Sequence, residues 1–143
     1  MHDTDRSATI MANDRLSASA PLALGVLRIM TGLLFLAHGT QKFLSFPGGE
    51  RAGFGWTFAG PPAYAGIIEL VTGVLIALGL FTRPAAFLAS GCMAVAYFMA
   101  HAPQNFFPVN NGGDAAILYC FVFLYLVFAG PGRLSLDAAR RRG

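Results

Sequence analysis

The sequence contains few charged residues and offers little cysteine chemistry. Only 12% of its 143 residues are charged, and its two cysteines, Cys92 and Cys120, form no Cys-x-x-Cys motif. Neither a disulfide framework nor a dithiol relay is therefore indicated, and we expect both cysteines to be buried as small hydrophobic residues. Because His-x-x-His spacing and haem, flavin or iron–sulfur signatures are also missing, we expect no metal site and no cofactor held by a recognised motif.

Hydrophobic residues, in contrast, make up 55% of the chain, and the mean hydropathy is +0.57. Such values are typical of an integral membrane protein, and the length fits one domain. The net charge of +3 comes from basic residues that lie almost entirely at the ends of apolar segments. This distribution argues against a nucleic-acid partner, because it leaves no basic face interleaved with aromatic residues.

Four apolar segments predict helices over residues 22–43, 64–81, 84–101 and 114–130. We therefore expect an all-α fold, an integral membrane four-helix bundle over residues 21–131. A disordered cytoplasmic tail is expected over residues 1–20, with at most a short helix near residues 10–16. A basic cytoplasmic tail is expected over residues 132–143. The loop between the first two helices contains Phe46, Phe54, Trp56 and Phe58, aromatic residues that suit the head-group level of a bilayer.

Four spans place both chain termini on one side of the membrane. Outside the helices, seven basic residues lie on that side and two on the other; the seven are Arg6, Arg15, Arg83, Arg133, Arg140, Arg141 and Arg142, and the two are Lys42 and Arg51. The positive-inside rule then predicts that both termini are cytoplasmic.

The first apolar segment carries a polar stripe beside a row of glycines. Arg28, Thr31, His38 and Lys42 fall within a sector of roughly 80° when each residue turns a helix by about 100°. Glycines at positions 25, 32 and 39 repeat on the adjoining sector, where they allow another helix to approach closely. Residues 25–34 also resemble residues 66–75, with opposite charges at matched positions. This similarity suggests an inverted repeat of the kind found in transporters.

Ionisable residues within or beside the apolar segments are the candidate site residues: Arg28, His38, Lys42, Glu69, His101 and Asp114. Charges that face lipid are costly, so these side chains are expected to point into the bundle. One interpretation is a polar cavity that opens outward and is closed below by Arg28, in which Glu69 and His38 handle protons. This cavity would be lined by Glu69, His38, His101, Lys42 and Asp114. Alternatively, Arg28 and Glu69 pair as a structural lock, Lys42 reaches the surface, and Asp114 stabilises a helix N-terminus.

Asparagines and glycines at positions 110–113 directly precede the last predicted helix. Backbone N–H groups around Asn111 can face an anion or a carbonyl-bearing head group. The same residue types are also ordinary in turns and helix caps, and the sequence leaves both interpretations open.

These features together resemble the DoxX family, small four-helix proteins of the bacterial inner membrane. The matching residues span about positions 22–137 and are Leu27-Arg28, His38-Gly39, Lys42, Glu69, Gly73, Gly79-Leu80, Thr82-Arg83, Asn111-Gly112-Gly113 and Gly130-Pro131-Gly132-Arg133-Leu134-Ser135-Leu136-Asp137. The position after the paired glycines commonly holds glutamate in this family, whereas here it is Asp114. The resemblance implies a site at Arg28, His38, Lys42, Glu69 and Asn111, without assigned roles.

The family takes its name from a link to thiosulfate:quinone oxidoreductase, which favours a membrane subunit of a redox system. Such a subunit would bind a quinone head group or a sulfur compound and would receive electrons from that ligand or from a redox partner protein. Two other functions stay open, a small-solute or proton-coupled transporter and a structural anchor for another subunit. Besides the lipid bilayer, a second copy of the chain is an expected partner, because the helices carry glycine-rich faces.

Overall fold

The computed structural model describes residues 3–48, 53 and 60–141, with side chains described from residue 14 onward. All regular structure in this part of the chain is helical, as predicted. The elements are α1 (Asp3–Leu44), α2 (Pro61–Leu78), α3 (Thr82–Ala96) with its π-helical continuation η1 (Tyr97–His101), α4 (Pro108–Asn111), α5 (Asp114–Ala129) and α6 (Leu136–Arg140). Phe54, Trp56 and Phe58 of the first loop lie outside the described residues.

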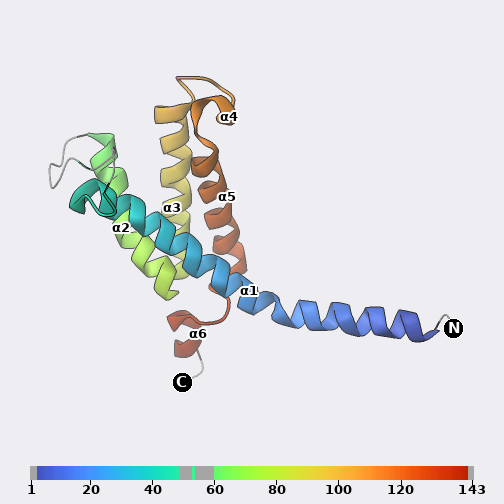
Figure 1. Cartoon of the computed structure of the whole chain (residues 1–143). Helices are drawn as coiled ribbons and strands as arrows, with labels where there is room; N and C mark the ends of the chain where they lie inside the picture. Colours follow the sequence, from blue (N-terminus) through green and yellow to red (C-terminus); the bar gives the residue numbers. More distant parts are fainter. Residues whose placement is uncertain (1–2, 49–52, 54–59, 142–143) are drawn as a thin grey trace.

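Helix α1 begins at Asp3, so the structure corrects the expectation of a disordered tail over residues 1–20. The N-terminal part of this 42-residue helix extends away from the other helices (Figure 1). Residues 3–20 contain no glycine and no proline. A helix that is already formed in the apolar segment can therefore continue through them, since extending a helix avoids the cost of nucleation.

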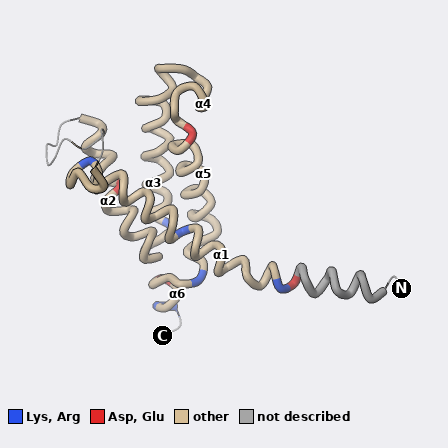
Figure 2. The backbone as a smooth tube through the Cα atoms, viewed as in Figure 1, with Lys and Arg blue, Asp and Glu red and all other residues tan. Residues whose placement is uncertain are grey.

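The four predicted apolar helices are present. Segments 14–44, 61–78 and 82–101 are long and apolar enough to cross a membrane, and Asp114–Ala129 is a shorter apolar helix. Few charged residues lie along these helices (Figure 2). Helix α2 starts three residues earlier than expected because Pro61 and Pro62 fit its first turn. It ends at Leu78 because Gly79 adopts a left-handed conformation with φ 66°.

The helices pack as two antiparallel pairs, α1 against α2 and α3 against α5, with α2 also contacting α3 (Figure 1). Glycines bring α1 and α2 close together. A Cβ atom at Gly32 would lie 2.6 Å from the backbone nitrogen of Ala77, and one at Gly73 would lie 2.9 Å from the backbone of Leu36. The close helix contact predicted from the glycine pattern is therefore confirmed.

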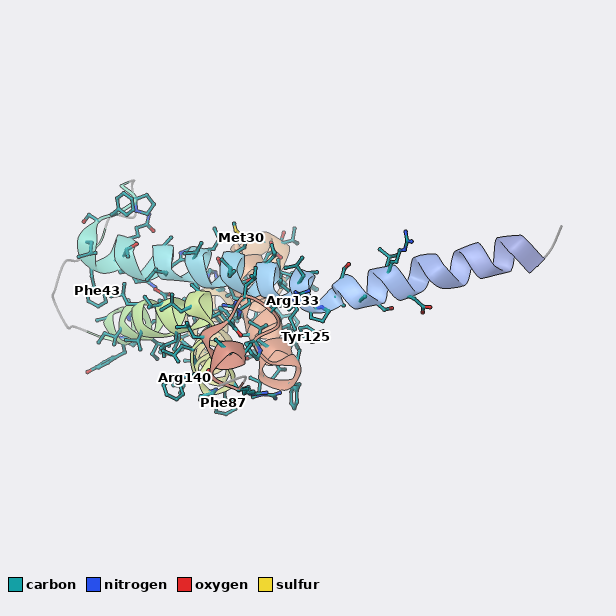
Figure 3. The ribbon with its side chains drawn as sticks, turned by 90° about the horizontal axis from the view of Figure 1, so that it is seen from below. Met30, Phe43, Phe87, Tyr125, Arg133 and Arg140 are labelled. Atoms are coloured by element: carbon teal, nitrogen blue, oxygen red, sulfur yellow. The ribbon has the colours of Figure 1, made fainter. Side chains whose placement is uncertain are left out.

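The core lies where α3 and α5 face each other and meet α1 and α2. Small residues of α3 let large residues of the other helices fill this space. The buried apolar residues are Phe35, Ile76, Ala85, Ala86, Ala89, Met93, Tyr97, Ala116, Phe123 and Leu126. Met30, Phe87 and Tyr125 are among the large side chains that project from the outer faces of the helices (Figure 3), as expected for surfaces that meet lipid.

Candidate functional site

The ionisable groups closest to each other are Lys42, in the last turn of α1, and Glu69, in the middle of α2. The Lys42 Nζ atom donates to both carboxylate oxygens of Glu69, at 2.5 and 2.6 Å. Glu69 is 3% exposed, whereas the Lys42 side chain is 27% exposed. Gly66 makes this geometry possible, because a Cβ there would lie 3.2 Å from the Cδ of Lys42 and 2.7 Å from the Phe43 ring.

This ion pair links two helices within an apolar environment. Each charge alone would be costly in hydrocarbon, and pairing reduces that cost. Since the ammonium group of Lys42 has three N–H donors and makes two contacts with Glu69, one donor is left for another group. The pair is therefore both a structural contact and a polar site that a ligand can reach from the exposed side of Lys42.

Aromatic side chains line the space next to this pair. The exposed His38 ring packs edge-to-face against Tyr119 of α5, with 5.9 Å between ring centroids. Tyr119 in turn stacks on Phe123, and Glu69 interacts electrostatically with Tyr119 and with Cys92. We call Lys42, Glu69, His38 and Tyr119 the Lys42–Glu69 site. Tyr119 was not predicted as a site residue, because only packing brings α5 next to α1.

Arg28 does not pair with Glu69, so the structural lock expected between them is wrong. Its guanidinium group instead donates to five backbone carbonyl groups at the ends of other elements: Ile76 and Ala77 at 2.6 Å, Leu134 at 2.7 Å, Pro131 at 2.8 Å and Arg133 at 3.4 Å. Arg28 is completely buried. Because all five of its donors are in use, Arg28 holds the C-terminus of α2 against the chain after α5 and has no donor left for a ligand in this arrangement.

His101, Asn111 and Asp114 lie near the turn between η1 and α5, apart from the Lys42–Glu69 site. The Nδ1 atom of His101 lies 3.0 Å from the carbonyl oxygen of Asn111. The Asn111 side chain accepts from the backbone of Gly113 at 2.7 Å, and Asp114 is exposed in the first turn of α5. Within the described part of the chain, none of these three residues hydrogen-bonds or forms an ion pair with Lys42 or Glu69. The structure thus brings together Lys42 and Glu69, with His38 nearby, but not the full set that was expected to line one cavity.

Cys92 and Cys120 are partly buried free thiols. Cys120 contacts Ser90, whose hydroxyl donates to the Cys120 carbonyl at 2.9 Å. Across residues 14–48, 53 and 60–141, no three His, Cys, Asp or Glu side chains are grouped as metal ligands would be.

The segment after α5 ties several helices together at the C-terminal end of α2. The Asp137 carboxylate accepts hydrogen bonds from the backbone N–H groups of Phe81 and Thr82, at 3.0 and 2.9 Å. Its own N–H donates to the Gly79 carbonyl at 2.9 Å, and the Arg133 N–H donates to the Pro21 carbonyl at 2.8 Å. Partial burial by itself raises the pKa of Asp137, but the hydrogen bonds from Thr82 and Phe81 outweigh it and hold that pKa below its usual value. Sequence reasoning noted this segment as a motif but missed its function as a clamp.

Comparison with known proteins agrees with the resemblance. The DoxX family model matches residues 23–102, which include Arg28, Lys42 and Glu69. An uncharacterized protein of Haemophilus influenzae is 47% identical over 82% of this chain and 90% of its own length. An uncharacterized membrane protein, Rv3486, of Mycobacterium tuberculosis is 33% identical over 85% of this chain and 83% of its own.

The inner membrane protein YphA of Escherichia coli is 32% identical over 84% of this chain and 91% of its own. No solved structure matches the chain. Together with the apolar helices, these relatives make the chain a multi-pass protein of the inner membrane.

Proposed function

This chain belongs to the DoxX family of membrane proteins, and on that premise we propose that it is a membrane subunit of a redox system that binds a quinone head group at the Lys42–Glu69 site. The observation that carries the proposal is the contact between a buried carboxylate and a partly exposed ammonium group, at 2.5 and 2.6 Å, inside an apolar bundle. Such a pair provides a hydrogen-bond donor and a proton acceptor where water is scarce.

The residues of the site fit the chemistry of a quinone. The third N–H donor of Lys42 suits a ligand carbonyl, and the His38 ring, whose nitrogens can carry a proton, is exposed on the surface of α1. Tyr119 and Phe123 supply stacked aromatic faces beside it. A quinone takes up two electrons and two protons on reduction to the hydroquinone. Because the chain has no redox-cofactor motif, we assign the delivery of electrons to a redox partner protein. We assign the transfer of protons to Glu69 and His38.

A direct binding measurement tests this proposal. Purified protein in nanodiscs is titrated with a short-chain quinone, and the bound fraction is followed by equilibrium dialysis. Glu69→Gln and Lys42→Met each keep the size of the side chain while removing one member of the pair. We expect each variant to bind the quinone at least about tenfold more weakly, the effect of losing one charge-assisted hydrogen bond.

His101→Gln is the matched control, because His101 is an ionisable residue that makes its contacts at the turn before α5. This variant is expected to bind the quinone as the original protein does. A thermal unfolding scan of each variant separates lost binding from lost folding. Equal binding by all four proteins, or no saturable binding by any of them, would contradict the proposal.

The remaining functions predict different outcomes. A structural anchor would keep its cellular function with Glu69→Gln once folding is verified. A transporter would show counterflow of a labelled solute across proteoliposomes without any redox change, consistent with the matched residues 25–34 and 66–75 acting as an inverted repeat.

We also place both termini on the cytoplasmic side, which puts the Lys42–Glu69 site nearer the periplasmic face. The basic residues Arg83, Arg133, Arg140 and Arg141 support this orientation, because they lie at the end of the bundle that holds α6. Reporter fusions that are active only in the cytoplasm should be active at both ends of the chain.

A further inference from the structure

A cavity of about 290 Å³ lies at the α6 end of the bundle, away from the Lys42–Glu69 site. It is open to the surface and is bordered by the start of α3, the chain that follows α5, and helix α6. Three of its lining residues are arginines, Arg83, Arg140 and Arg141, and a single carboxylate, that of Asp137, shares it. The cavity is thus a predominantly cationic site built from two segments of the sequence, residues 81–84 and 131–141.

Two of the three arginines of this cavity are held by contacts within the protein. The Arg83 Nη1 atom donates to the carbonyl oxygens of Val127 and Phe128, at 2.6 and 3.1 Å, which orients the guanidinium group and leaves its other nitrogens for another partner. The Arg140 guanidinium carbon lies 5.7 Å from the centre of the Phe81 ring, a cation–π geometry. Asp137 accepts hydrogen bonds from the start of α3, so its charge is already compensated there.

The cavity also lies at the edge of the apolar layer. Helix α3 begins at Thr82 and α5 ends at Ala129, so both apolar helices end beside it. Phe87, which is 64% exposed, stands one helical turn from Arg83 on the same face of α3. Phe128, at the end of α5, is 74% exposed. Figure 3, seen from below, shows Phe87 and Arg140 on the same side of the bundle.

We propose that this cavity binds the phosphodiester group of an acidic membrane phospholipid, with the acyl chains lying along the exposed Phe87 and Phe128 side chains. Guanidinium groups match phosphate oxygens in geometry and charge, and basic pockets at the ends of transmembrane helices suit acidic lipid head groups. The apolar surface beside the arginines is what distinguishes a lipid from a free phosphate. This inference is independent of the quinone proposal, since the two sites share no residue.

Native mass spectrometry of the full-length protein tests the lipid site. The protein is released from micelles that contain increasing amounts of phosphatidylglycerol, with phosphatidylcholine as the neutral comparison. Arg140→Gln/Arg141→Gln removes two exposed charges from the cavity. Because each arginine near an anionic lipid contributes on the order of fivefold in binding, we expect the double variant to bind phosphatidylglycerol roughly 30-fold more weakly.

Arg15→Gln/Arg133→Gln is the matched control. It removes the same net charge from exposed positions that do not line the cavity, and we expect it to retain phosphatidylglycerol nearly unchanged. The single variants Arg140→Gln and Arg141→Gln, each with about a fivefold loss, provide the same test if the double variant folds poorly.

Three results would overturn the proposal. The first is an equal loss in the control, which would indicate only diffuse attraction between charges. The second is equal retention of the two lipids by the original protein. The third is displacement of phosphatidylglycerol by excess glycerol 3-phosphate, which would assign the cavity to a soluble phosphate.

Discussion

Replacing Arg28 with methionine should destabilise the protein more than any other change of a single charged residue outside the Lys42–Glu69 pair. The guanidinium group is completely buried, and four of its five hydrogen bonds are 2.6 to 2.8 Å long. If each of these contributes about 1 kcal/mol net, Arg28→Met should lower the free energy of unfolding by about 4 kcal/mol. The loss includes the bond to the Ala77 carbonyl at the C-terminus of α2, whereas the Ile76 carbonyl keeps the backbone N–H of Gly79 as a donor at 3.0 Å.

Arg28→Lys tests whether the charge alone or the geometry of the guanidinium group stabilises the protein. Lysine keeps the charge but has three donors on a single nitrogen, so it cannot reach both the α2 carbonyls and the chain after α5. We expect Arg28→Lys to lower the free energy of unfolding by about 2 kcal/mol, half of the decrease expected for Arg28→Met. The assay is equilibrium unfolding in mixed micelles with an increasing fraction of sodium dodecyl sulfate, followed by circular dichroism.

Arg133→Gln is the control, because the Arg133 side chain is exposed and the residue contributes only backbone groups to the clamp. It should change the free energy of unfolding by less than about 0.5 kcal/mol. A loss below about 1 kcal/mol for Arg28→Met would refute the reasoning, since it would mean that the buried carbonyl groups find other donors. Full stability in Arg28→Lys would show that charge, and not the shape of the guanidinium group, is what the site requires.

Three further predictions concern two pairs of glycines and Asp137 of the clamp. Gly79→Ala should lower the free energy of unfolding more than Gly112→Ala does. Both residues have positive φ, but only Gly79 is packed against other groups. We expect a loss of about 1 kcal/mol for Gly112→Ala and at least twice that for Gly79→Ala, measured by the same unfolding assay. Gly32→Ala should destabilise the contact between α1 and α2, whereas Gly91→Ala, which adds a Cβ in open space, should be neutral or stabilising by up to about 1 kcal/mol. If the two variants of either pair changed the free energy of unfolding by similar amounts, the close contacts described for Gly79 and Gly32 would be contradicted. Because the pKa of Asp137 is lowered by folding, its stabilising effect should be present at neutral pH and lost as the pH falls below about 4. Asp137→Asn should therefore be less stable than the original protein at pH 7, with a difference that shrinks in acid; a constant difference would argue against the ionised clamp.

Much of the fold was predictable because apolar length and glycine spacing are local properties of the chain. The four apolar helices and the close contact between α1 and α2 were predicted from residues 22–130 alone. The helical extension over residues 3–20 was missed, since polar composition there suggested disorder while the absence of glycine and proline allowed the helix to continue.

The site was predicted less completely. The cavity interpretation placed Lys42 and Glu69 in one site, but it placed His101 there as well, and the alternative interpretation paired Arg28 with Glu69. Counting residues gives the height of a side chain in the membrane but not its direction around the bundle. Arg28 has its backbone between Gly25 and Gly32, and the chain after α5 folds back against this region to supply its carbonyl partners.

The sequence by itself determined that this chain crosses the membrane several times, that its first two apolar helices pack closely, and that its few charges must find partners. Those conclusions depend on the cost of polar groups in hydrocarbon, which applies wherever the residue lies. Only the tertiary structure decided which partner each charge has. Lys42 pairs with Glu69, and Arg28 with backbone carbonyl groups 48 to 106 residues away, because these pairings require the relative rotation of the helices and the return of the C-terminal segment, and no short stretch of sequence fixes either.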